Sequence, residues 1–193
     1  MPSLMVDFIM SLDGYGAAEG WPGYWGMEGP EYLGWIKDDE AVEHTTLMGA
    51  TTYRLMSEFA AQMPDDPGLA GLTASRKVVF SSTLEEPLSW ANTELVNGDP
   101  VETVREMKRR DSRPLRTVGS LSLSRSLIAA GEVDRFRVVV FPVITGATGM
   151  DRIFDAYPDI ALELVETRTF DGRLQLLEYV PTVLDGPPGA GGS

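Results

Sequence analysis

The sequence predicts an α/β fold with a mostly parallel central sheet that is flanked by helices and closed by a C-terminal antiparallel hairpin. Apolar strand-like runs alternate with helix-like runs through the first two-thirds of the chain, the order of parallel strands joined by helices. Two apolar runs then flank Asp171-Gly172, a pair typical of hairpin turns. We expect a single domain over residues 1–180 and a disordered, Gly- and Pro-rich tail over residues 181–193.

The first half of the chain alternates strands and helices. Residues 3–10 are apolar and run into the turn at 11–14, so they predict the first strand. Residues 14–34 contain seven glycines and predict a loop. The remaining elements expected here are helices over 30–43 and 51–63, a Pro-, Asp- and Gly-rich connector over 64–71, and short strands over 46–48, 77–80 and 94–96.

Recognisable helix ends organise the second half. Asp99 is a typical N-cap ahead of Pro100, and Ser120 is expected to cap a helix that stops at Gly131. The expected strands are 115–118, the almost wholly apolar run 136–144 that is typical of a strand buried on both faces, and the hairpin strands 162–169 and 174–180.

One local pattern occurs three times: an apolar strand runs directly into a small polar turn. The three turns are Gly49-Ala50-Thr51-Thr52, Ser81-Ser82-Thr83 and Gly119-Ser120. Ligands of open α/β sheets bind just outside the carboxyl ends of the strands. Glycine allows a backbone to approach a phosphate closely, and hydroxyls and helix N–H groups bind its oxygens. The pattern therefore predicts a phosphorylated, nucleotide-like ligand.

Charge and composition exclude several classes of partner. The formal net charge of -13 disfavours nucleic acid and anionic membranes. The one basic cluster, which is Lys108-Arg109-Arg110 with Arg113 and Arg116, is interpreted as a solvated helix end in preference to an anion site. The absence of cysteine fits a cytoplasmic location. No set of His, Asp and Glu has the spacing of a metal site.

Six short motifs also occur in a fixed order. They are Ser11-Leu12-Asp13-Gly14, Leu47-Met48-Gly49-Ala50-Thr51-Thr52-Tyr53, Val79-Phe80-Ser81-Ser82-Thr83-Leu84, Val118-Gly119-Ser120, Val133-Asp134 and Pro142-Val143-Ile144-Thr145-Gly146. Together they resemble the dihydrofolate reductase-like superfamily, in its branch related to the reductase domain of bacterial riboflavin biosynthesis (RibD C-terminal domain). The resemblance covers roughly residues 3–180.

The resemblance implies an NADPH-dependent reductase, often a homodimer in this branch, which acts on a small molecule. An apolar C-terminal hairpin, whose edge self-pairing would protect, independently favours the dimer. The resemblance also implies the cofactor contacts: Gly49, Thr51 and Thr52 at the phosphates, Ser81 and Ser82 near the adenosine ribose, and Gly119, Ser120, Leu121 and Ser122 at the pyrophosphate.

Three positions depart from the family pattern. Ala50 stands where an arginine usually helps to hold the 2′-phosphate, and Gly119-Ser120 stands where two or more glycines are usual. Tyr32 stands where true dihydrofolate reductases carry the catalytic carboxylate. Glu31 is adjacent, but one step along a helix turns a side chain by about 100°, so Glu31 is expected to point elsewhere. True folate reduction is therefore not expected.

The candidate catalytic residues are Asp13 and Tyr32. Asp13 could orient substrate or nicotinamide, or it could simply form a turn with Gly14. The single histidine, His44, is expected at a helix end rather than as a general acid. Trp21 and Trp25 could form a lid over a flat heterocycle or pin the loop by aromatic packing, and the seven glycines favour the lid.

These observations lead to one main functional hypothesis. The chain is expected to be an NADPH-dependent reductase of a small heterocyclic (pyrimidine- or pterin-like) or carbonyl substrate, resembling 5-amino-6-(5-phosphoribosylamino)uracil reductase. The alternative is a non-catalytic NADPH- or nucleotide-binding module, which Ala50 and the missing carboxylate favour. A flavin-binding protein is a third hypothesis.

Overall fold

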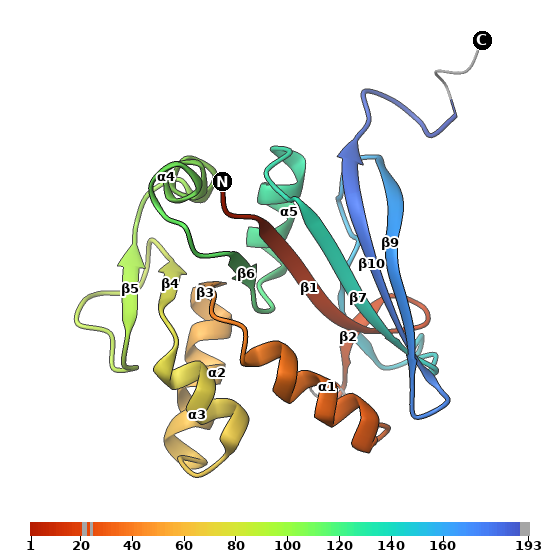
Figure 1. Cartoon of the computed structure of the whole chain (residues 1–193), viewed down its shortest axis with the longest axis horizontal. Coiled ribbons are helices and arrows are strands. Elements are labelled where there is room, and N and C mark those ends of the chain that lie inside the picture. The colour runs from red at the N-terminus through yellow and green to blue at the C-terminus, as the bar shows by residue number, and fades with distance from the viewer. Residues whose placement is uncertain (21–22, 24, 190–193) are drawn as a thin grey trace.

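The structure is a computed structural model that describes residues 1–20, 23 and 25–189. Among these residues the main sheet has eight strands in the order β5-β4-β3-β6-β1-β7-β10-β9, and β2 and β8 form a separate ribbon (Figure 1). The strands are β1 (Leu4–Ser11), β2 (Tyr15–Ala18), β3 (Thr45–Gly49), β4 (Lys77–Phe80), β5 (Thr93–Val96), β6 (Leu115–Thr117), β7 (Arg135–Phe141), β8 (Gly149–Arg152), β9 (Ile160–Phe170) and β10 (Leu174–Val183). The helices are α1 (Pro30–Glu40), α2 (Ala50–Gln62), α3 (Pro67–Ala74), α4 (Pro100–Arg110) and α5 (Leu121–Ala129).

The strands from β5 to β7 run parallel, and β10 and β9 complete the sheet in antiparallel orientation. This confirms the predicted fold. Asp171 and Gly172 have φ angles of 50° and 65°, as expected for the residues of a tight hairpin turn. The last strand continues to Val183, which pairs with Ile160, so the hairpin extends beyond the domain boundary expected at residue 180.

The sequence did not predict three short elements, which are β2, β8 and α3. The segment 14–34, expected to be a loop, begins with β2, which pairs with β8. The connector 64–71 contains the start of α3, where the side chain of Asp66 accepts a hydrogen bond from the backbone N–H of Leu69 at 3.0 Å and Pro67 follows. The same Asp-Pro pair correctly predicts the start of α4. The sequence therefore contained a signal for the start of α3 as well, which the prediction did not use.

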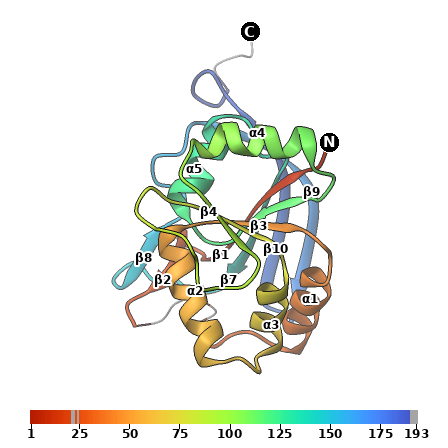
Figure 2. The same cartoon turned by 90° about the vertical axis from the view of Figure 1, so that its left-hand side faces the viewer.

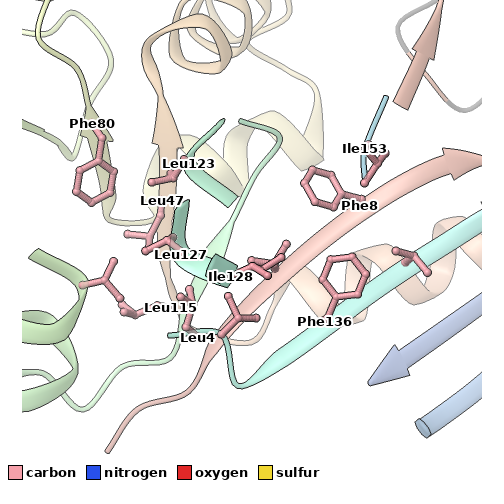
Figure 3. Close-up of a cluster of buried hydrophobic side chains, with 14 of the residues drawn as sticks. Leu4, Phe8, Leu47, Phe80, Leu115, Leu123, Leu127, Ile128, Phe136 and Ile153 are labelled. Carbon is pink, nitrogen blue, oxygen red and sulfur yellow. The ribbon is translucent and has the colours of Figure 1, made fainter. Parts of the chain in front are cut away.

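Buried side chains pack against both faces of the main sheet. One face carries α4 and α5, with a large cluster that includes Leu47 and Leu127 (Figure 3). The other face carries α1, α2 and α3, with separate clusters around Tyr32 and around Met48. Figures 1 and 2 show the two groups of helices on opposite sides of the strands. Leu47 and Met48 are neighbours on β3 and enter different clusters, which explains why this strand is apolar on both faces.

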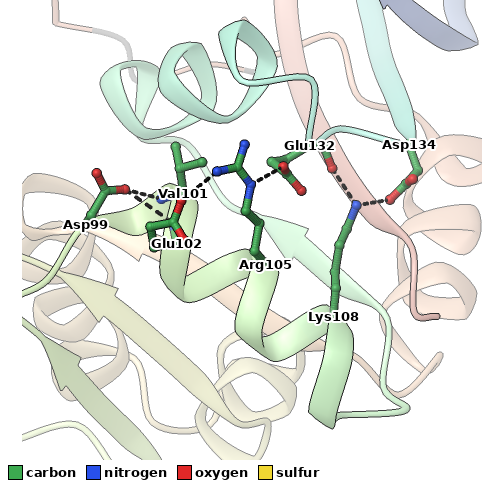
Figure 4. Close-up of polar contacts among 7 residues, drawn as sticks. All are labelled: Asp99, Val101, Glu102, Arg105, Lys108, Glu132 and Asp134. Atoms are coloured by element: carbon green, nitrogen blue, oxygen red, sulfur yellow. Dashed lines mark hydrogen bonds and ion pairs between the residues drawn. The ribbon is translucent and has the colours of Figure 1, made fainter.

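The charged contacts drawn in Figure 4 attach helix α4 to the connection between α5 and β7. Asp99 caps its first turn, as expected, by accepting hydrogen bonds from two backbone N–H groups. Arg105 pairs with Glu132 at 2.6 Å. Lys108 bonds to the Glu132 carbonyl and to Asp134, both at 2.6 Å. Lys108, the first cation of the basic cluster, is therefore used to anchor the helix and is not free to bind an anion.

Candidate functional site

The carboxyl ends of the parallel strands meet at one edge of the main sheet. All three predicted polar turns follow strands that end at this edge, namely β3, β4 and β6. Strand β3 lies between the other two and pairs with both. The structure therefore brings the three turns together, at the kind of edge where open α/β sheets bind ligands.

One hydroxyl joins the turns that follow β3 and β6. The Oγ of Ser120 accepts a hydrogen bond from the backbone N–H of Gly49 at 2.7 Å and lies 2.8 Å from Oγ1 of Thr52. Gly119 has a φ of 56°, and a Cβ at this position would come within 3.0 Å of Oγ1 of Thr52. Both the backbone conformation and the close packing therefore favour glycine at 119. Four of the predicted cofactor residues form this one cluster.

Ser120 is not the side-chain cap that the sequence predicts for α5. Its backbone is left-handed, with φ 61° and ψ 67°, and its hydroxyl bonds to Gly49 rather than to a helix N–H. A partner 71 residues away outcompetes the local capping bond. Non-glycine residues in this conformation cost about 1–3 kcal/mol and are concentrated at ligand-binding turns.

Two helices begin at the cluster without a side-chain cap among the described residues. Helix α2 follows Gly49, which has no side chain, and α5 follows Ser120, whose hydroxyl is used elsewhere. The first N–H groups of each helix, which include those of Thr51, Leu121 and Ser122, are the groups that a cap would otherwise satisfy. Together with the positive ends of the helix dipoles, they suit the oxygens of a phosphate.

The turn after β4 is organised by Ser81. Its Oγ accepts hydrogen bonds from the backbone N–H groups of Thr83 and Leu84, at 3.0 Å and 3.1 Å. Ser82 is exposed beside it. The first hydroxyl shapes the turn and the second faces outward, so the predicted contact of these serines with an adenosine ribose stays a prediction.

Asp13 links the end of β1 to the segment after β7 through hydrogen bonds. Its Oδ1 accepts hydrogen bonds from Oγ of Ser11 at 2.7 Å and from the backbone N–H of Thr145 at 3.1 Å. The Ser11 hydroxyl holds the pKa of the Asp13 carboxyl below its ordinary value, so this group is a carboxylate near neutral pH. Ser11 and Thr145 are buried polar residues that the sequence analysis did not single out, although both lie within the quoted motifs.

Tyr32 lies on the buried face of α1. It is 2% exposed, and its ring packs against those of Trp35, Phe141 and Phe170 with centroid separations of 5.8, 5.7 and 5.8 Å. This packing gives Tyr32 a structural role, and its catalytic role stays a prediction. Glu31 points elsewhere, as expected: its carboxylate accepts a hydrogen bond from the backbone N–H at position 171.

Of the two predicted lid tryptophans, Trp25 is described and Trp21 lies outside the described residues. The Trp25 ring lies against Phe141 with a centroid separation of 5.3 Å, and its backbone has a φ of 46°. Phe141 is the last residue of β7, so Trp25 lies at the carboxyl edge of the sheet. The lid itself stays a prediction.

Other candidate features lie away from this edge. His44 precedes β3 at its amino end, where its Nδ1 is 2.7 Å from the Val42 carbonyl and burial lowers its pKa. A cavity of about 670 Å³ is lined by Arg76, Trp90 and Glu94 among others, near the amino ends of β4 and β5.

Within the described ranges, no helix is long and apolar enough to cross a membrane, and no group of three or more His, Asp or Glu side chains could hold a metal ion.

Comparison with known protein families identifies the family of the chain. The model of the RibD C-terminal domain matches residues 2–176. The chain belongs to the RibD C-terminal domain family. This confirms the resemblance to the dihydrofolate reductase-like superfamily, in the branch related to the riboflavin-biosynthesis reductase domain.

Relatives cover nearly the whole chain. The uncharacterized protein YyaP of Bacillus subtilis (strain 168) is 27% identical over 180 residues, which is 91% of this chain and 93% of YyaP. A putative riboflavin biosynthesis protein from Shewanella sp. PV-4 superposes with a TM-score of 0.74 at 18% identity, covering 93% of this chain and 99% of that one. A diaminohydroxyphosphoribosylaminopyrimidine deaminase/5-amino-6-(5-phosphoribosylamino)uracil reductase from Thermotoga maritima superposes with a TM-score of 0.63 at 15% identity, covering 94% of this chain and 57% of that one. At these identities the solved structures establish the fold alone.

Proposed function

We propose that the chain is an NADPH-dependent reductase of a small heterocyclic (pyrimidine- or pterin-like) or carbonyl substrate, resembling 5-amino-6-(5-phosphoribosylamino)uracil reductase. The observation that carries the proposal is the cluster of Gly49, Thr52 and Ser120, from which two uncapped helices start. Membership of the RibD C-terminal domain family supports the reductase class. The absence of cysteine supports a cytoplasmic location, which is part of the proposal.

The residues at the cluster fit the pyrophosphate of NADPH. Backbone N–H groups and the hydroxyls of Thr52 and Ser120 offer hydrogen-bond donors. The glycine at 119 keeps side-chain bulk away from them. The 2′-phosphate has less support, because Ala50 brings no cation. We therefore expect a modest preference for NADPH over NADH, below about a hundredfold, or 2.7 kcal/mol.

When bound, NADPH would supply the hydride. The chain would bind and orient the reactants. Asp13, held by Ser11 and Thr145, presents a carboxylate at the edge shared by β1 and β7, where it would accept a hydrogen bond from substrate or from the nicotinamide amide. Because its pKa is lowered, Asp13 would position the reactants and would not donate a proton near neutral pH.

The first test is cofactor binding by the Gly49→Val variant. A Cβ at Gly49 would already lie 3.4 Å from Oγ of Ser120, so the valine methyl groups would occupy the space next to that hydroxyl, where a phosphate has to approach. Energy transfer from tryptophan to NADPH should saturate in the wild type and be lost in the variant. Gly34→Val is the matched control, because a Cβ at Gly34 meets nothing within 4 Å, and it should bind like the wild type. Absence of a saturable wild-type signal at millimolar NADPH would sink the proposal.

The second candidate is a nucleotide-binding module without catalysis. Two observations favour it: Ala50 replaces the usual cation, and Tyr32 is buried among aromatic rings where a catalytic carboxylate would be expected. Stoichiometric NADPH binding with no oxidation, across a panel of pterins, pyrimidines and quinones, would select this candidate over the reductase.

A further inference from the structure

The cavity at the amino ends of β4 and β5 has no part in the proposed reductase site. Its volume is about 670 Å³, which is within the usual range for sites that bind small molecules. The three polar turns follow the carboxyl ends of β3, β4 and β6, so the cavity lies at the opposite edge of the same sheet. A ligand in this cavity would therefore be additional to the cofactor and the substrate.

The cavity has a positively charged side chain with hydrogen-bond donors to spare. Arg113, which lies between α4 and β6, lines the cavity. Its Nε pairs with Oε1 of Glu43 at 3.2 Å, and the two side chains are 46% and 77% exposed. Ion pairs that are exposed to this extent are weak, and a guanidinium has five N–H donors. Arg113 can therefore offer donors to a ligand that carries a carboxylate.

A carboxylate on β5 lines the same cavity. Oε2 of Glu94 lies 3.2 Å from Nη2 of Arg76, and the Glu94 side chain is 56% exposed. Arg76 has a closer partner in Asp111, at 2.8 Å. The backbone N–H of Arg113 holds the pKa of the Asp111 carboxyl below its usual value, so Asp111 is charged near neutral pH. Because Asp111 neutralises Arg76, the Glu94 carboxylate can accept hydrogen bonds from a ligand.

The wall between these groups and α3 is held in place by hydrogen bonds. Nε1 of Trp90 donates to Oγ1 of Thr73 at 2.8 Å, and the Lys77 ammonium lies 4.8 Å from the centre of the Trp90 ring. Nδ2 of Asn92 donates to the carbonyls of Thr73 and Ala74, both at 3.2 Å. These contacts join the end of α3 to the segment that precedes β5. The cavity is thus formed before any ligand arrives, as is usual for small-molecule sites.

A smaller and more apolar cavity adjoins the first. It has a volume of about 290 Å³ and shares Asn92 with the larger cavity as a lining residue. Met63 and Pro64 line its other side, and Met63 is 46% exposed. An apolar surface beside a few charged groups is typical of a site that binds a small organic molecule. A ligand that fills both cavities needs charged groups at one end and an apolar group at the other.

We propose that the two adjoining cavities bind a free α-amino acid with an apolar side chain. Arg113 would donate hydrogen bonds to the α-carboxylate, and Glu94 would accept hydrogen bonds from the α-ammonium. The apolar side chain would lie toward Met63. A zwitterion has no net charge, so the net charge of -13 on the chain does not oppose its binding as it would oppose a polyanion. This inference does not depend on the proposed reductase function.

The test uses L-phenylalanine as the probe, with two matched ligands. The first, 3-phenylpropionate, lacks the ammonium, and the second, phenethylamine, lacks the carboxylate. The full-length chain is labelled with ¹⁵N at tryptophan, and the indole N–H resonance of Trp90 is assigned by its loss in Trp90→Phe. L-Phenylalanine should shift this resonance saturably, with or without millimolar NADPH. Each matched ligand should bind about tenfold more weakly, as expected for the loss of charge-assisted hydrogen bonds.

Variants assign the two charged contacts separately. Arg113→Gln should weaken L-phenylalanine binding about tenfold and leave phenethylamine binding unchanged, because that ligand has no carboxylate. Glu94→Gln should also weaken L-phenylalanine binding about tenfold, without weakening the binding of 3-phenylpropionate. Arg110→Gln is the control, because Arg110 is 78% exposed on α4 and pairs with Glu106 outside the cavity. The ion pairs removed are exposed, so all three variants should keep the wild-type melting temperature and NADPH affinity.

Three results would overturn the proposal. The first is a Trp90 resonance that L-phenylalanine does not shift saturably at concentrations up to tens of millimolar. The second is equal affinity for L-phenylalanine and both matched ligands, because the two charged groups would then contribute nothing. The third is displacement of L-phenylalanine by NADPH, which would place the amino acid at the carboxyl edge. If L-phenylalanine binds as described and NADPH does not bind, the reductase proposal fails and this inference stands.

Discussion

The Ser120 hydroxyl links the turns that follow β3 and β6. A serine ahead of a helix is a typical N-cap, and the sequence predicts that role. The structure instead places its hydroxyl between Gly49 and Thr52, in the turn that follows a neighbouring strand. The motifs name Gly49, Thr52 and Ser120 as cofactor contacts, and that role stays a prediction. They could not predict the bond between Ser120 and Gly49, because it depends on the pairing of β3 with β6.

We predict that Ser120→Ala weakens NADPH binding. Removing the hydroxyl leaves the Gly49 N–H and the Thr52 hydroxyl without the group that orients them, at a cost of about 1 kcal/mol, or roughly fivefold in affinity. The measurement is the energy-transfer titration. Ser126→Ala is the control on the same helix, because that exposed hydroxyl bonds only within α5, to the Ser122 carbonyl. Equal affinities for wild type and Ser120→Ala would contradict the assigned role.

The start of helix α1 depends on a hairpin that is distant in the sequence. The side chain of Asp171 accepts hydrogen bonds from the backbone N–H groups of Glu31 and Tyr32, each at 3.1 Å, and the Glu31 carboxylate accepts from the Asp171 N–H at 2.5 Å. This is a reciprocal cap across 140 residues. The sequence predicted the hairpin turn and the helix start separately. Their contact could not be predicted, because only the folded sheet brings β9 beside α1.

We predict that Asp171→Gly destabilises the protein by about 1 kcal/mol, the usual value of an N-cap. Glycine tolerates the positive φ at this position, so the loss reports the cap rather than backbone strain. Urea denaturation monitored by tryptophan fluorescence measures it. Asp38→Ala, an exposed change on the same helix, should alter stability by less than about 0.5 kcal/mol. Similar values for the two variants would show that the cap does not hold α1.

The sequence did not predict strands that have weak local signals, because such strands form only when a distant partner pairs with them. Strand β2 is Tyr-Gly-Ala-Ala, with neither the alternation nor the branched residues that predict strands. It forms because β8 supplies a partner. The apolar strand expected over 136–144 forms as β7, since burial on both faces leaves a continuous signal in the sequence, but it ends at Phe141, three residues earlier than expected.

The main sheet ends in an exposed edge strand that carries three large apolar side chains. Strand β9 is 11 residues long and pairs with β10 on one side. Leu162, Leu164 and Val165 on it are 46%, 55% and 50% exposed. Long apolar edge strands are normally covered, and a second copy of the chain can do this by symmetric pairing. We therefore propose a homodimer through this edge.

The predicted mass in solution is twice the 21.1 kDa of one chain. Light scattering at micromolar concentration measures it. Leu164→Lys should shift the protein toward the monomer, because a charge on the edge opposes pairing, while Leu55→Lys, on the equally exposed surface of α2, should leave the mass unchanged. A wild-type mass near that of one chain would refute the dimer. A dimer insensitive to Leu164→Lys would place the interface elsewhere.

We expect NADPH to bind where α2 and α5 begin, and a crystal structure of the NADPH complex would show its position. The pyrophosphate oxygens should lie within hydrogen-bond distance of N–H groups in the first turns of both helices, beside the Ser120 hydroxyl, with the nicotinamide directed toward Asp13. Cofactor bound at the opposite edge of the sheet, for example in the cavity lined by Arg76, would contradict it.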